Sequence, residues 1–155
     1  MNWAHAHLII NHIPVLGVLG GILLLGYAIV RKSDEVTMLS FVLFALVALA
    51  TIGVFVAGEE AEDMVKNLPG VTEAYIGNHE EIASVALVLT ETLGLLCIVG
   101  LFLLRKRGAI PRWLVFTVLG TSLVAAVAVG FTAYLGGQIR HTEIRSDPAS
   151  LAPAR

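Results

Sequence analysis

Four long apolar runs constrain the fold of this chain more than any other feature of its sequence. They cover approximately residues 8–30, 38–57, 82–104 and 113–135. Each run is long enough to cross the roughly 30 Å hydrocarbon layer of a membrane as an α-helix. With 57% hydrophobic and 14% charged residues, the chain is too apolar for an ordinary soluble domain of this size. We therefore expect an all-α integral membrane protein with one domain over residues 1–145 and a short irregular tail over residues 146–155.

The basic residues predict how the four spans are oriented. Six of the ten lie in two short turns, one after the first span and one between the third and fourth: Arg31, Lys32, Arg105, Lys106, Arg107 and Arg112. The positive-inside rule places these turns in the cytoplasm, with both termini and an acidic loop at residues 58–81 outside. Two short turns also imply two antiparallel hairpins, which pack most simply as an up-down-up-down four-helix bundle.

The charge pattern excludes one large class of function. The net charge is −2, and the basic residues are scattered in short turns rather than gathered on one surface. Nucleic-acid binding requires a contiguous positive surface, so we expect no nucleic-acid partner. The single cysteine, Cys97, lies inside an apolar run and allows no intramolecular disulfide.

All five histidines fall at or just beyond the span ends that the orientation places outside. Imidazoles gathered on one membrane face indicate a bound haem or metal ion, because bundles build such sites from facing helices. The favoured ligands are His12, His79 and His141, since each comes from a different helix end, and His7 is a further candidate. Around them, Glu59, Glu60 and Glu80 are candidates to orient the imidazoles, and Arg140 is a candidate to pair with a haem propionate.

Two readings of this histidine group stay open. Paired histidines with Gly136 and Gly137 nearby fit b-type haem, because glycines let a macrocycle approach the backbone. Histidines beside many carboxylates fit a non-haem iron, copper or zinc site equally well in chemical terms. No Glu-x-x-His or His-Glu-x-x-His signature is present to favour a di-iron or hydrolase site.

Glu91 stands near the middle of the third span, between Thr90 and Thr92. A bare carboxylate there is unfavourable by roughly 2.5–3.5 kcal/mol, so we expect it to be protonated, hydrogen-bonded or facing a polar cavity. Two roles are equally compatible with its position. It either fixes helix packing through hydrogen bonds to threonines, or relays protons toward Glu80 along a stripe through Ser84.

Two motifs at the ends of the chain resemble a known family. The string from His7 to Pro14, His-x4-His-x-Pro, is similar to the start of the four-helix bacterial membrane proteins named domain of unknown function 2231. The string Leu135-Gly136-Gly137 resembles the glycine-glycine exit from their last span. The resemblance implies a four-helix protein of the bacterial inner membrane. It also implies an electron-transfer setting, because some members are joined to c-type cytochrome domains.

From these features we expect a membrane electron-transfer protein that binds haem b at its outer face through histidines. Its expected partners, besides the lipid bilayer, are a c-type cytochrome, the quinone pool or a larger respiratory complex. The alternatives are a non-haem centre of histidine and glutamate ligands, for metal handling or catalysis, and an accessory subunit without chemistry of its own.

Overall fold

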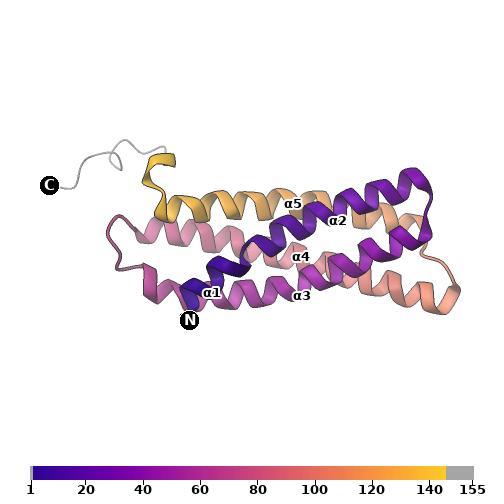
Figure 1. Cartoon of the computed structure of the whole chain (residues 1–155), viewed down its shortest axis with the longest axis horizontal. Coiled ribbons are helices and arrows are strands. Elements are labelled where there is room, and N and C mark those ends of the chain that lie inside the picture. The colour runs from indigo at the N-terminus through magenta and orange to yellow at the C-terminus, as the bar shows by residue number, and fades with distance from the viewer. Residues whose placement is uncertain (1, 146–155) are drawn as a thin grey trace.

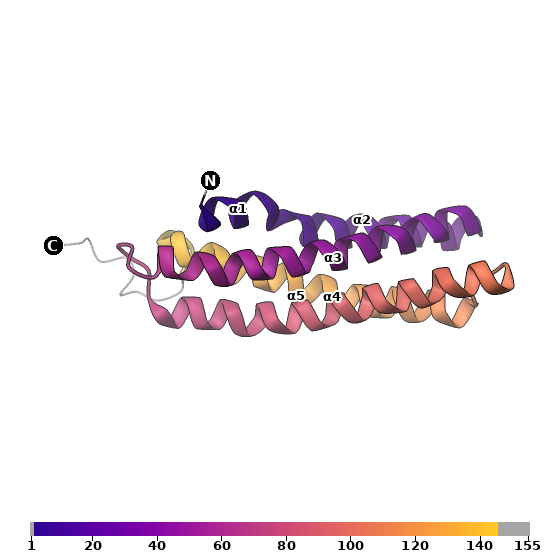
Figure 2. The same ribbon diagram turned by 90° about the horizontal axis from the view of Figure 1, so that it is seen from below.

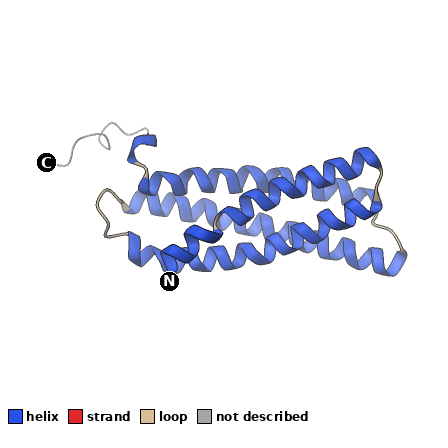
Figure 3. Ribbon diagram, in the orientation of Figure 1, coloured by secondary structure: helices blue, strands red, loops and turns tan. Residues whose placement is uncertain are grey.

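The computed structural model describes residues 2–145, and within this range the chain is entirely helical, without any strand (Figure 3). Five α-helices are followed by one short 3₁₀ turn, η1. Their bounds are α1 Trp3–Ile10, α2 His12–Arg31, α3 Asp34–Val65, α4 Glu73–Arg107, α5 Arg112–Arg140 and η1 Thr142–Ile144. The prediction of an all-α fold is confirmed; the expected tail at residues 146–155 lies outside the described residues.

The helices form four antiparallel rods, because α1 and α2 together make one broken rod (Figure 1). Each rod packs against the next along the chain, and α2 also packs against α5, which closes an up-down-up-down bundle. The first rod and α4 therefore stand on opposite corners. All four rods are long and apolar enough to cross a membrane. The start of α1, the connection between α3 and α4, and η1 lie together at one end, here called the outer end (Figure 1).

The first rod bends where α1 ends at Ile10 and α2 begins at His12. Pro14 has no backbone N–H to donate to the carbonyl of Ile10, and its ring crowds that carbonyl. The bend directs α1 toward α3, on which it packs, and away from α4 (Figure 2). The rod is therefore not the continuous helix expected over residues 8–30.

The expected outer loop at residues 58–81 is wrong in its bounds. The α3 helix continues to Val65 and α4 begins at Glu73, so only residues 66–72 connect them. Glutamate and alanine favour helix, and the first strong helix breakers after Gly58 are Pro69 and Gly70. Most acidic residues of this segment consequently lie on helical extensions beyond the apolar runs, close to the site described below.

Glycines set how closely the rods approach one another. A Cβ at Gly94 of α4 would lie 2.4 Å from the Cβ of Ala48 on α3, and one at Gly21 would lie 2.3 Å from the ring of Phe44. Phe44 is fully buried at this crossing, together with Phe41, Leu25 and Leu93. In a membrane, where lipid offers no hydrophobic driving force between helices, close packing of this kind is a main source of helix association.

We expect Gly94→Ala to destabilise the bundle, because the methyl of Ala48 has no flexible side chain that can move aside. The expected loss is about 1–3 kcal/mol of unfolding free energy, as for other overpacked cores. Thermal unfolding in detergent, followed by circular dichroism, measures it. Gly120→Ala is the matched control, because a Cβ there meets nothing within 4 Å. Equal melting temperatures for the two variants would contradict the close contact.

Candidate functional site

His7 of α1 packs directly onto α3 at the outer end of the bundle. A Cβ at Gly58 would lie 3.1 Å from the ring Cε1 and 3.2 Å from Nδ1, so any other residue there would require the ring to shift by a few tenths of an ångström. The ring Nδ1 lies 3.0 Å from the carbonyl oxygen of Val54, one helical turn before Gly58. A carbonyl only accepts hydrogen bonds, so Nδ1 carries the proton, and Nε2 of the neutral ring keeps its lone pair.

His79 of α4 repeats this arrangement on α5. A Cβ at Gly136 would lie 3.0 Å from its Cε1 and 3.2 Å from its Nδ1. Its Nδ1 lies 3.0 Å from the carbonyl oxygen of Thr132, again one turn before the glycine. The Thr132 carbonyl can accept this bond beside its helical one because its oxygen has two lone pairs. His79 is thus held in the same tautomer as His7. Its Nδ1 carries the proton, and its Nε2 keeps a lone pair.

The two hairpins therefore carry equivalent histidine seats, in which the first helix supplies the ring and the second supplies a glycine and a carbonyl. The ring and the carbonyl are 47 residues apart in the first hairpin and 53 in the second. This difference in spacing hides the repeat in the sequence, where only the pairs Asn11-His12 and Asn78-His79 suggested one. Both seated rings are partly buried, and they lie close enough for their charges to interact.

Asn11 contributes a third polar group to the first rod at this level. It lies one turn after His7, on the helix face that continues through the buried residues Pro14 and Val18. Its side-chain Oδ1 is buried and has no hydrogen-bond partner within the described part of the chain. An acceptor buried in this way is costly, and native proteins normally satisfy it with a protein group, a water or a ligand.

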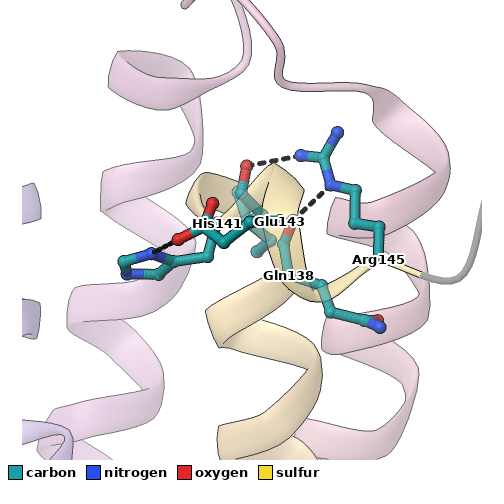
Figure 4. Close-up of polar contacts among 5 residues, drawn as sticks. Gln138, His141, Glu143 and Arg145 are labelled. Atoms are coloured by element: carbon teal, nitrogen blue, oxygen red, sulfur yellow. Dashed lines mark hydrogen bonds and ion pairs between the residues drawn. The ribbon is translucent and has the colours of Figure 1, made fainter. Parts of the chain in front are cut away.

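The other histidines that the sequence suggested as ligands lie on the surface. His12 is exposed and lines an open groove of about 570 Å³ between α2 and α3, among apolar side chains. His141 is exposed and pairs through Nδ1 with the Glu143 carboxylate at 2.9 Å (Figure 4). Hydrogen bonds from its own backbone N–H and from His141 lower the pKa of Glu143. Neither His12 nor His141 has the glycine and carbonyl seat that His7 and His79 share.

The residues expected around the ligands also have different roles. The imidazoles are oriented by backbone carbonyls rather than by Glu59, Glu60 or Glu80, although Glu80 faces Glu62 and Glu59 across the α3–α4 contact. Gly136 accommodates the ring of His79, and a Cβ at Gly137 would meet Ile144 at 3.4 Å. Arg140 is exposed at the end of α5.

Arg145, which the sequence analysis missed, fastens this end of the bundle. Its guanidinium donates to the carbonyls of Gln138, Ile139 and Gly70, two of which belong to the last turn of α5 (Figure 4). The same group lies 4.3 Å from the ring centre of Tyr75, one turn before His79 on α4. A buried arginine after a helix end can be suspected from sequence, but its acceptors are distant backbone atoms that carry no sequence signal.

Glu91 is partly buried on α4, and its Oε1 has no hydrogen-bond partner among the described residues. The neighbouring hydroxyls of Thr90 and Thr92 donate to the carbonyls of Ala86 and Val88 in their own helix. The expected carboxyl–threonine bonds between helices are therefore not formed in the described structure. On the suggested proton path, Ser84 is exposed and Leu87 is partly buried. The relay itself stays a prediction.

Within residues 2–145, no three histidine, cysteine or acidic side chains are grouped so that they could hold a metal ion. No family model matches the sequence, and comparisons with curated proteins and with solved structures find no match. The resemblance to domain of unknown function 2231 thus stays a prediction.

We expect Gly58→Ala to push the ring of His7 away from α3 and weaken its bond to Val54, because the added methyl would lie only 3.1 Å from the ring. In ¹⁵N-histidine NMR spectra, His7 should lose the Nδ1–H tautomer while His79 keeps it. Gly53→Ala on the same helix is the control, since a Cβ there meets nothing within 4 Å. An unchanged His7 signal in Gly58→Ala would contradict the seat described above.

Proposed function

We propose that this chain is an integral membrane electron-transfer protein that binds b-type haem near the outer face, with His7 and His79 as the residues that would hold its iron. The observation that supports the proposal most is the pair of equivalent seats, which hold two imidazoles from opposite corners of the bundle in the Nδ1–H tautomer. Haem iron takes the neutral imidazole nitrogen that this tautomer leaves free. The carbonyl bond to Nδ1 also raises the basicity of that nitrogen.

The residues at the outer end fit this cofactor in two respects. Gly58 and Gly136 keep side-chain bulk away from both ligand rings. Two prepared imidazoles satisfy a haem iron, whereas a non-haem centre needs a larger group of ligands, which is not found within residues 2–145. Bound haem would supply one-electron chemistry at its iron.

The protein's own residues hold and orient the iron ligands. Because the site is near one membrane face, electrons would pass there to or from a c-type cytochrome, the quinone pool or a larger respiratory complex. Acidic side chains on the α3 and α4 extensions, including Glu59, Glu62 and Glu80, give this end a negative character that suits a basic partner. The proposed location is the bacterial inner membrane.

The purified protein should be coloured and should show the reduced-minus-oxidised bands of a low-spin bis-imidazole haem. His7→Ala and His79→Ala should each abolish this low-spin spectrum, because either change removes one iron ligand. His12→Ala and His141→Ala are the matched controls and should leave the spectrum unchanged, since both rings are exposed and unseated. Absorption spectra of the membrane extract and of the purified protein measure the effect.

Three other outcomes would each contradict the proposal. Loss of the spectrum in His12→Ala or His141→Ala alone would identify these exposed histidines, rather than His7 and His79, as the iron ligands. A colourless protein with stoichiometric zinc, copper or iron would identify a non-haem centre. A folded protein that lacks both haem and metal after gentle extraction would favour an accessory subunit.

The proposed orientation has its own test. With both termini and the α3–α4 connection outside, a cysteine introduced at Lys66 should react with a membrane-impermeant maleimide added to intact cells. A cysteine introduced at Ala109, in the α4–α5 turn, should react only after the membrane is opened. Cys97 is buried and serves as the internal background. The reverse labelling pattern would place the histidine seats on the cytoplasmic side.

A further inference from the structure

The end of the bundle opposite the histidine seats contains a small cavity between the two helical hairpins. Its volume is about 120 Å³, and it is bounded by the α2–α3 turn on one side and the α4–α5 turn on the other. The lining combines four polar side chains with an apolar wall, and its members include Lys32, Asp34, Thr37, Arg112, Ile29 and Phe116. The cavity thus brings one basic residue from each hairpin to the same space.

The two basic side chains at this cavity are available to a ligand. Lys32 and Arg112 are both exposed, and neither takes part in an ion pair within the described residues. Asp34 lies on the same wall and is the one acidic group among the lining residues of the described range 2–145. The hydroxyl of Thr37 already donates to the carbonyl of Ser33. Two cations against one carboxylate leave the cavity with an excess of positive charge.

The start of α5 adds to this charge. Its N-cap residue, Pro111, provides no side-chain hydrogen bond, so the first backbone N–H groups of a 29-residue helix stay uncapped beside Arg112. The apolar part of the wall includes Phe116, an exposed residue one turn further along the membrane-spanning part of α5. A ligand that fits both parts carries an anionic head and an apolar tail.

We propose that this cavity binds the phosphodiester head of an anionic phospholipid from the leaflet that faces the basic turns. Lys32 and Arg112 contact the phosphate from the two hairpins, and the acyl chain lies along the exposed apolar wall at Phe116. Basic pockets between membrane helices on the cytoplasmic side are suited to such headgroups. The lipid then bridges the two hairpins at the end where only short turns connect their helices. This site is independent of haem and of the outer histidines.

The test uses the full chain reconstituted in phosphatidylcholine bilayers with and without phosphatidylglycerol, followed by native mass spectrometry of the retained lipid. Wild-type protein should retain phosphatidylglycerol in preference to phosphatidylcholine. Lys32→Gln and Arg112→Gln should each weaken retention about fivefold, the ratio that corresponds to about 1 kcal/mol for one basic group at an anionic surface. Asp34→Asn should strengthen retention, because it removes the one negative group from the wall.

Two controls separate this cavity from general attraction to a basic face. Arg31→Gln and Arg107→Gln remove one charge each from the same two turns, but neither residue lines the cavity. Retention that falls equally in all four variants would overturn the proposal. Lys32→Arg should retain the lipid and exclude misfolding as the cause of a loss in Lys32→Gln. Displacement of the lipid by inorganic phosphate at equal concentration would identify a free-phosphate site and overturn the lipid assignment.

Discussion

The fit of large side chains against glycine determines how this bundle is assembled. In a membrane, apolar side chains gain little by leaving lipid for a neighbouring helix, so association depends on close packing. The rings of Phe44 and Phe41 occupy the space that Cβ atoms would fill at Gly21 and Gly100, and Val47 does the same at Gly17. These contacts join α2 to α3 and α3 to α4, so α3 is packed closely against both of its neighbours in the bundle.

The histidine seats extend the same principle from packing to chemistry. At Gly58 and Gly136 the missing Cβ admits an imidazole instead of a phenyl ring, and the carbonyl one turn earlier takes the Nδ1 proton. That carbonyl is already engaged within its helix but has a second lone pair to offer. One backbone feature, a glycine four residues after an accessible carbonyl, thereby fixes both the position and the tautomer of the ring.

The sequence was sufficient to predict the four helical spans but not the side-chain contacts between them. Hydropathy predicts four spans because each run must satisfy its backbone within itself, and this requirement is local. The bend after Ile10 was not predicted, although its cause, the missing backbone N–H of Pro14, is local in the sequence. The choice of His7 over His12 was not predictable, because both lie at the same end of the same rod. It depends on which ring meets a glycine and a carbonyl on a distant helix. The carbonyl that His7 contacts, that of Val54, is 47 residues away in the sequence.

The two seats differ in how firmly the structure supports them. His79 belongs to a 35-residue helix whose first turns are fastened to α5 and to the preceding connection by Arg145. His7 belongs to an eight-residue helix that contains no buried residue and ends at the break at Asn11. A helix this short has little stability of its own in water. The position of His7 consequently depends on its contacts with Gly58 and Val54. The same contacts help to hold α1 against α3.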